Sequence, residues 1–200
     1  MTSHIKDLFV RPPGGGGGWL AGADDPVLSW LMRERSWQAH FIGQIYPRHG
    51  ERILDLGCRT GTLTIALHRA CPGADVSGLD VDADVLRIAR DKARACGACV
   101  AFWQGRADDP ASAPVVRPST FDKIAACFPF HHLSAERRRI ALACMVTLLR
   151  RGGSLHVAEW GSTTDRLPPL MQEAGLDAAR GAQRYLTVFG SVVFYRGVRR

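Results

Sequence analysis

The chain has 200 residues, of which 46% are hydrophobic, and this suits a single domain with its own core. No apolar run approaches the roughly 20 residues of a membrane-spanning helix, and the first ten residues do not resemble a secretory signal, so we expect a cytoplasmic protein without membrane insertion. The net charge of +7, from 23 Arg and 3 Lys against 19 acidic residues, could favour nucleic acid, but the arginines are scattered along the chain.

The six cysteines are predicted to be packed thiols. Four lie in or beside apolar segments, where a free thiol behaves as a small hydrophobe: Cys58, Cys71, Cys127 and Cys144. Cys96 and Cys99 form one C-x-x-C pair, but a structural zinc site usually needs a second pair of ligands, and none stands at suitable spacing. We therefore expect no metal site.

The N-terminal part is predicted to begin with a flexible tail. Residues 1–18 end in RPPGGGGG, which cannot bury apolar surface, so a single domain is expected over 19–200. Asp25-Pro26 is a good helix start, with Asp as N-cap and Pro at the first helical position. The helix that follows would end before Pro47 and carry one apolar stripe: Trp30, Trp37, Phe41 and Ile45.

From Glu51 onward, strand and helix patterns alternate. The expected strands are 52–56, 76–81, 100–104, 121–128 and 154–159, and the expected helices are 61–70, 82–96, 134–151 and 167–174. The helix from Ser134 should bury Ile140, Cys144 and Leu148 and end at Gly152-Gly153. Segments 184–189 and 192–198 read as an antiparallel hairpin. The pattern predicts an α/β fold with a mostly parallel sheet, whose ligand site lies at the carboxyl ends of the strands.

The loop after the first strand reads Asp55-Leu56-Gly57-Cys58-Arg59-Thr60-Gly61. A dinucleotide fingerprint starting at Gly57 would need glycines where Arg59 and Thr62 stand, and a P-loop would need G-K-[ST]. Asp80 ends the second strand some twenty residues later, where an acid can accept hydrogen bonds from both hydroxyls of a ribose. We expect Asp82 to cap the next helix and to leave Asp80 free.

These segments together resemble the class I S-adenosylmethionine (SAM)-dependent methyltransferases. ILDLGCRTGTLTIAL resembles their first motif, D-x-G-x-G-x-G, and GLDVDADVLRIARDKA resembles their second. FDKIAACFPFHHL and LLRRGGSLHVAEW resemble their fourth and fifth strand regions. The likeness is closest to small bacterial relatives of the ubiquinone/menaquinone-type enzymes. It implies a Rossmann-like sheet of seven strands with an antiparallel C-terminal hairpin, and SAM as cofactor.

The resemblance also implies a cofactor site. The methionine part of SAM would be surrounded by the loop residues Asp55, Gly57, Cys58, Arg59 and Gly61. Asp80 would hold the ribose, and Val81, Ala107 and Asp108 would contact the adenine. Cys127 would lie near the sulfonium. The family usually has Gly where Arg59 stands; a non-glycine residue in a strained conformation costs on the order of 1–3 kcal/mol, although Arg59 could instead pair with the SAM carboxylate.

The acceptor side is less specific. His131 and His132 are candidates for acid–base catalysis, and Trp30, Trp37, Glu159 and Trp160 for the acceptor pocket, which the N-terminal helix or a second subunit would cover. We expect methyl transfer to a small molecule such as a quinone, phenol, amine or biosynthetic intermediate. Two alternatives remain open: an RNA methyltransferase, although Cys127-Phe128-Pro129-Phe130 lacks the Asn/Asp-Pro-Pro-aromatic motif, and a SAM-binding protein without methylation activity, because of Arg59.

Overall fold

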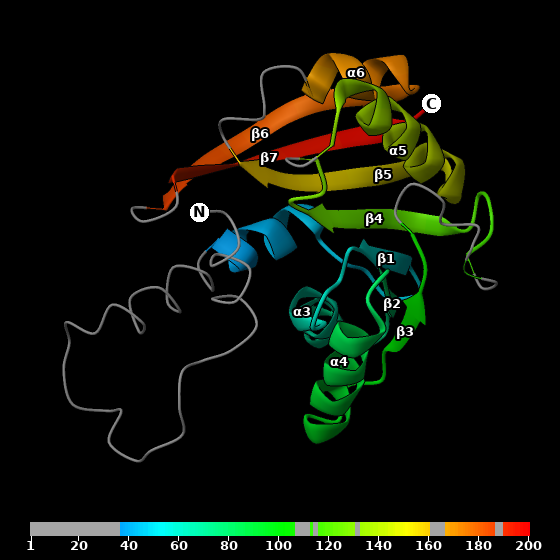
Figure 1. The fold of residues 1–200 in the computed structure, drawn as a ribbon, viewed down its shortest axis with the longest axis vertical. Helices are drawn as coiled ribbons and strands as arrows, with labels where there is room; N and C mark the ends of the chain where they lie inside the picture. The colour runs from blue at the N-terminus through cyan, green and yellow to red at the C-terminus, as the bar shows by residue number, and fades with distance from the viewer. Residues whose placement is uncertain (1–36, 107–112, 114–115, 131–132, 161–166, 187–189) are drawn as a thin grey trace. The chain divides into compact units, whose positions relative to one another are not determined.

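The computed structural model describes residues 37–106, 113, 116–130, 133–160, 167–186 and 190–200 (Figure 1). The chain divides into two units, Met1–Arg35 and Ser36–Arg200, and all described residues belong to the second. The expected boundary after residue 18, the helix start at Asp25 and the stripe residue Trp30 lie outside the described residues.

Seven strands form one sheet in the order β3-β2-β1-β4-β5-β7-β6 (Figure 1). Their bounds are β1 Arg52–Leu56, β2 Asp75–Asp80, β3 Ala101–Gln104, β4 Phe121–Cys127, β5 Leu149–Trp160, β6 Leu176–Leu186 and β7 Gly190–Arg199. The pairs among β1 to β5 are parallel, whereas β7 pairs antiparallel with both β5 and β6. The predicted fold class is confirmed, including the antiparallel C-terminal hairpin.

The described helices are residues 37–45, α3 (Thr62–Ala70), α4 (Ala83–Ala95), α5 (Ala135–Leu148) and α6 (Leu167–Glu173). Two predicted N-caps are confirmed. The Asp82 carboxylate accepts a hydrogen bond from the Asp84 N–H at 2.8 Å, and the Ser134 hydroxyl accepts one from the Arg137 N–H at 3.4 Å.

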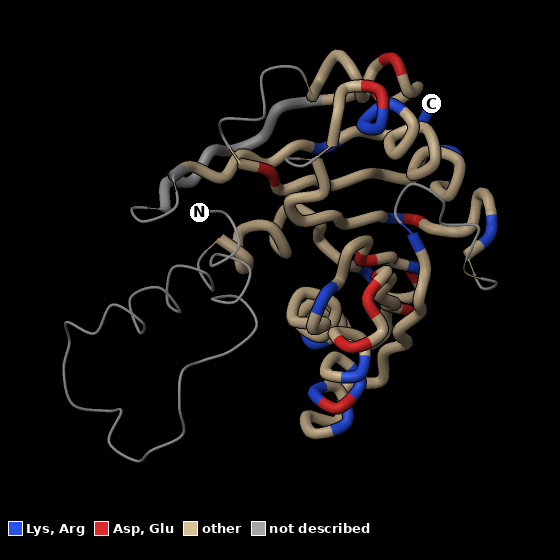
Figure 2. The backbone as a smooth tube through the Cα atoms, in the orientation of Figure 1, with Lys and Arg blue, Asp and Glu red and all other residues tan. Residues whose placement is uncertain are grey.

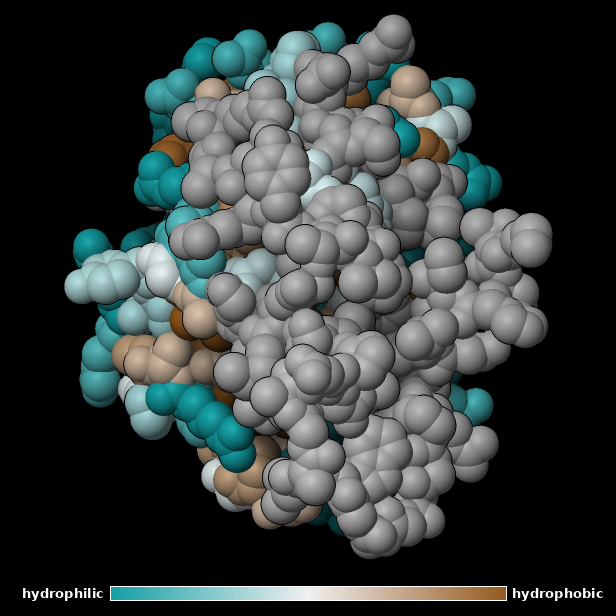
Figure 3. Space-filling view, turned by 90° about the vertical axis from the view of Figure 1, so that its left-hand side faces the viewer, coloured by the Kyte–Doolittle hydropathy of each residue, from teal (hydrophilic) through white to brown (hydrophobic). Residues whose placement is uncertain are grey.

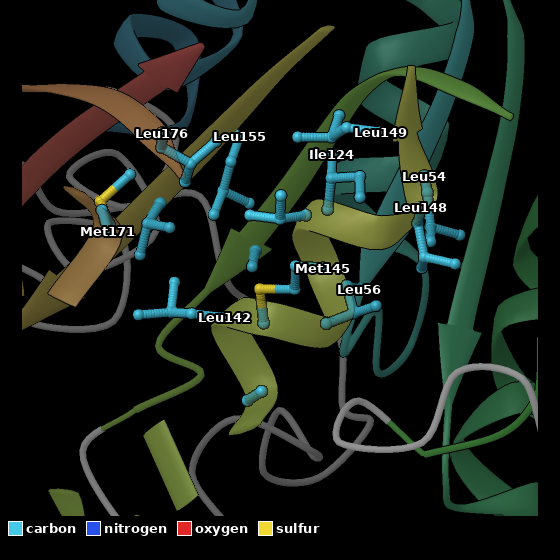
Figure 4. Packing of buried hydrophobic residues seen from close by; sticks show 14 of the residues in the cluster. Leu54, Leu56, Ile124, Leu142, Met145, Leu148, Leu149, Leu155, Met171 and Leu176 are labelled. Atoms are coloured by element: carbon cyan, nitrogen blue, oxygen red, sulfur yellow. The ribbon is translucent and has the colours of Figure 1, made fainter. Parts of the chain in front are cut away.

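The two faces of the sheet are covered by different helices. On one face, Phe41 and Ile45 of the N-terminal helix pack with residues of α3 against Ile53 and Phe194, and the rings of Phe41 and Phe194 stack at 5.6 Å. On the other face, α5 packs against the central strands and α6 packs against β6 and α5, and Figure 4 shows leucine and methionine side chains of this layer. Both layers exclude water from the parallel strands.

The end of α5 differs from the prediction. The helix ends at Leu148, and β5 begins at once with Leu149. Gly152 and Gly153 therefore lie inside β5, opposite a register shift between Phe121 and Lys123. A Cβ on Gly153 would come within 2.9 Å of the Arg150 carbonyl oxygen, so this glycine permits a bulge rather than a helix end.

The buried face of α5 was predicted only in part: Leu148 is buried as expected and Cys144 is half-buried, whereas Ile140 is 48% exposed. The helix also buries Ala141, Leu142 and Met145. Apolar residues occur almost all round this helix, so their spacing did not define the face that meets the sheet.

The packed-thiol prediction is wrong for Cys96 and Cys99, which are exposed, while all six cysteines are free thiols. Cys96 is the C-cap residue of α4, and Cys99 lies just beyond it, where its N–H donates to His68 Nε2 at 3.3 Å.

The first strand of the predicted hairpin begins earlier than expected, at Leu176 rather than Arg184. The prediction missed its first residues because Ala, Arg and Gly in this segment give no strand pattern.

Among the described residues, no helix is long and apolar enough to cross a membrane. On the face shown in Figure 3, the hydrophobic residues that are coloured form small areas between hydrophilic ones.

Candidate functional site

The glycine loop, residues 57–61, joins the carboxyl end of β1 to α3 and is fastened to β2. The N–H groups of Gly57 and Cys58 both donate to the Leu79 carbonyl, at 2.8 and 3.0 Å. Gly57 and Gly61 have φ values of +76° and +72°, which favour glycine. A Cβ on Gly61 would lie 2.6 Å from the Phe102 ring, whereas one on Gly57 would meet no atom within 4 Å. Packing therefore requires Gly61, and Gly57 leaves open space beside the loop.

Asp80, at the end of β2, is connected to this loop. Its Oδ2 accepts a hydrogen bond from the Arg59 N–H at 2.8 Å, and its Oδ1 accepts one from the Asp82 N–H at 3.1 Å. Asp82 rather than Asp80 caps α4, as expected, but Asp80 is not free, because it accepts these two backbone N–H groups. A carboxylate has about four lone-pair sites, so both oxygens keep capacity for further donors.

Asp55, the last residue but one of β1, is buried beneath the loop with 1% of its surface exposed. Burial raises the pKa of its carboxyl to about 7, the hydrogen bond from Thr64 opposes this rise, and the charge of Asp80 adds to it. The Thr64 hydroxyl donates to Asp55 Oδ2 at 2.6 Å. Burial also raises the pKa of the Cys58 thiol, which is therefore neutral. An added positive charge beside Asp55 would favour its ionised form.

A further residue holds the loop from outside. The Lys92 ammonium on α4 donates to the hydroxyls of Thr60 and Thr62, at 3.1 and 2.9 Å. Neither Lys92 nor Thr64 was singled out from the sequence. Thr64 stands nine residues after Asp55 at the start of α3, a spacing that could have suggested it, whereas the Lys92 contact depends on how α4 packs beside α3.

An aromatic cluster follows the next parallel strand. Cys127 is the last residue of β4, and Phe128 turns the chain with a φ of 54°. The Phe128 ring stacks on Trp160 at 4.5 Å and meets Trp37 edge-on at 5.5 Å. Two predicted pocket residues, Trp37 and Trp160, are thus brought together, and Phe128 is a member that the sequence analysis missed.

Glu159 is fully buried beside this cluster. Its Oε2 accepts a hydrogen bond from the Phe130 N–H at 2.8 Å, and its Oε1 accepts one from the Trp160 N–H at 3.0 Å. Its carboxylate therefore fixes the turn after β4, which favours a role in shaping the pocket over contact with an acceptor.

Val81 follows β2 with 62% of its surface exposed, an apolar area beside Asp80 that a planar ring could cover. The other predicted site residues lie outside the described residues: His131, His132, Ala107, Asp108 and Trp30.

A glycine loop after β1, an acid at the end of β2 and a sheet of this strand order together define the class of Rossmann-like SAM-dependent methyltransferase folds. Residues 53–153 match the family model described as a methyltransferase domain. The chain belongs to this family.

Individual relatives agree with this assignment. The chain is 31% identical to a demethylmenaquinone methyltransferase of Thermus thermophilus over 78% of its own length and 66% of the relative's. It is 32% identical to the ubiquinone/menaquinone biosynthesis C-methyltransferase UbiE of Bordetella parapertussis, over 72% of its own length and 55% of the relative's. It therefore spans only part of these proteins.

Among solved structures, the magnesium protoporphyrin IX methyltransferase ChlM of Synechocystis, determined with bound SAM, superimposes with a TM-score of 0.73. The superposition covers 99% of this chain and 92% of ChlM at 19% identity, so it shows a shared fold.

Proposed function

We propose that this protein transfers the methyl group of SAM to a small-molecule acceptor. The observation that carries the proposal is the junction of the glycine loop with Asp80, where Gly57 leaves open space and Val81 exposes an apolar surface. The family assignment supports it. The small size of the acceptor is supported by relatives whose names specify quinone biosynthesis.

In the proposed complex, the Gly57 carbonyl and the Asp55 carboxylate face the ammonium of SAM, and the ribose hydroxyls donate to Asp80. The adenine packs on Val81. These residues fit the three parts of SAM. The amino acid part meets a buried acid, the ribose diol meets a carboxylate that can accept hydrogen bonds, and the planar adenine meets an exposed apolar side chain.

Bound SAM supplies a methyl group on its sulfonium, and the protein has to orient the acceptor and exclude water. The stacked rings of Phe128 and Trp160, with Trp37 at their edge, favour an acceptor that contains a planar ring, such as a quinol or a phenol. His131 or His132 is proposed to take a proton from such an acceptor.

The cofactor site is tested by titrating SAM into the full chain by calorimetry. Asp80→Asn should weaken SAM binding by about tenfold or more, because it weakens acceptance from both ribose hydroxyls. Asp82→Asn is the matched control: this residue caps α4, and Asn caps a helix about as well as Asp, so the substitution should leave both the unfolding midpoint and the SAM affinity nearly unchanged. Equal SAM affinity in the wild type and Asp80→Asn would show that the ribose assignment is wrong.

Activity is tested separately with methyl-labelled SAM and a panel of hydroquinones, phenols, aromatic amines and short RNAs. We expect the wild type to transfer label to at least one ring-containing small molecule. The Trp160→Ala variant should transfer less label to the same molecule. Label in RNA alone would support the alternative acceptor class, and SAM binding without any transfer would contradict the proposed activity.

A further inference from the structure

A pocket lies away from the glycine loop and toward the amino ends of the parallel strands. Its volume is about 380 Å³. Its walls come from the end of helix 37–45 and the chain that follows it, from the start of β4 and from β5 up to His156, with Arg196 contributed by β7. Ligands of parallel sheets bind at the carboxyl ends of the strands, where the loop and Asp80 lie, so this pocket is separate from the methyl-transfer site.

The pocket has a surplus of positive charge. Two carboxylates face four cationic side chains, and each carboxylate is paired: Glu51 with Lys123 at 2.6 Å, and Asp122 with Arg150 at 2.5 Å. Acidic and basic positions adjoin near the start of β4 in Figure 2. Within the part of the chain that the structure describes, the remaining two cations, Arg48 and Arg196, have no carboxylate partner.

The two surplus arginines have different environments. The Arg48 guanidinium lies over the Tyr46 ring, 5.3 Å from its centroid, next to the mouth of the pocket. Arg196 is exposed and stands directly opposite His156 in the pairing of β7 with β5. Because both guanidinium groups can move on long side chains, both can turn toward an anion in the pocket.

His156 adds a buried polar group to the pocket wall. Its side chain is 1% exposed, and its Nε2 lies 2.9 Å from the Ser154 hydroxyl oxygen. Its Nδ1 is buried and has no hydrogen-bond partner in the described structure. Burial, with the charges of Arg196 and Lys123, lowers the pKa of the imidazole to about 3, so the ring is neutral at pH 7.

A neutral imidazole carries one N–H, and its place depends on Ser154. If the Ser154 hydroxyl donates to Nε2, the proton stands on Nδ1, and His156 presents a buried donor without an acceptor. An unsatisfied buried donor is costly, typically about 1–3 kcal/mol. An oxygen-rich ligand in the pocket would satisfy it.

We propose that this pocket binds the phosphate group of a small molecule. Guanidinium groups match phosphate oxygens in bidentate geometry, and a tetrahedral phosphate can accept from donors on several sides, here from Arg48, Arg196 and the His156 ring, which all line the pocket. A carboxylate offers only two oxygens in one plane. The volume accommodates pyrophosphate or a comparable phosphate-bearing molecule.

The binding test uses the full chain labelled with ¹⁵N and observes the imidazole nitrogens of His156 by NMR at pH 7. Inorganic phosphate and pyrophosphate should shift these resonances with saturation at millimolar concentration, and acetate at equal ionic strength should not. The absence of any His156 shift with either phosphate overturns the proposal, and an equal response to acetate replaces it with a general anion site.

Two variants and a control locate the binding. Arg196→Gln and Arg48→Gln should each weaken pyrophosphate binding by about tenfold, because each removes a charge-assisted contact. Arg151→Gln removes an exposed arginine from the same strand as Arg150 but outside the pocket lining, and should change binding less than twofold. Equal losses in all three variants would show attraction by net charge and overturn the assignment to this pocket.

Discussion

Asp55 should make the stability of the unliganded protein fall as the pH rises. Its carboxyl is fully buried, and its pKa of about 7 exceeds the ordinary 3.8 by about three units, equivalent to roughly 4 kcal/mol at most. A raised pKa means that the folded state favours the protonated acid. The contribution of Asp55 is therefore most favourable below pH 3.8 and is lost as the pH rises from there to about 7.

The substitution Asp55→Asn isolates this effect, because the amide resembles the protonated acid and can still accept the Thr64 hydrogen bond. Urea unfolding between pH 4 and pH 8 should show the variant close to the wild type at pH 4 and more stable by up to about 4 kcal/mol at pH 8. Titrating groups that do not interact with Asp55 cancel in this difference. A difference that does not change with pH would refute the assignment of the raised pKa to Asp55.

SAM binding should reverse the effect. If the SAM ammonium lies beside Asp55, its charge lowers the carboxyl pKa, and binding near pH 6.5 releases a proton. The dissociation constant should then rise roughly tenfold from pH 8 to pH 6. Calorimetry in two buffers of different ionisation enthalpy measures the released proton, and identical heats in both buffers would place the ammonium elsewhere.

Four further substitutions test the loop. Gly61→Ala should lower the free energy of unfolding by about 2–5 kcal/mol, because the backbone is left-handed and the new Cβ would clash with the Phe102 ring. The matched Gly57→Ala should lower it by only about 1–2 kcal/mol, because the Cβ meets open space. Urea unfolding measures both values. Arg59→Gly should raise the free energy of unfolding by about 0.5–1 kcal/mol. If calorimetry also shows a loss of SAM affinity, the Arg59 side chain pairs with the SAM carboxylate; unchanged affinity would oppose that pairing. Lys92→Met should weaken SAM binding several-fold without changing the secondary structure seen by circular dichroism, and unaltered affinity would show that the loop holds its shape without it.

The alternation of short apolar strands with capped helices was enough to predict the sheet and its C-terminal hairpin. The strands β1, β2 and β4 are buried over most of their length, so they read as apolar runs, and polar caps such as Asp82 and Ser134 mark where helices begin. The prediction failed where a residue type serves two purposes. Gly152-Gly153 is a common helix end, yet here it forms a bulge in β5.

The candidate site was predictable only as far as it is local in sequence. The loop and Asp80 stand at a fixed spacing, so pattern alone pointed to them. The Phe128 ring joins Trp37 and Trp160 only because β4 and β5 are neighbours and the N-terminal helix packs over them. Such contacts between segments far apart in the chain leave no periodic signal.

Arg59 shows how a departure from the family pattern can be accommodated. Its left-handed backbone costs about 1–2 kcal/mol relative to glycine, but the same conformation directs its N–H to Asp80 at 2.8 Å. This hydrogen bond to a carboxylate stabilises the loop conformation, and a glycine at the same position could donate it equally. The loop and the acid are thereby one unit, so the residue proposed to hold the ribose also sets the shape of the loop around the methionine part. Loss of Asp80 should consequently disturb SAM at both ends. Asp80→Asn is a sharper test than removal of the side chain, because the amide oxygen can still accept one of the two backbone N–H groups.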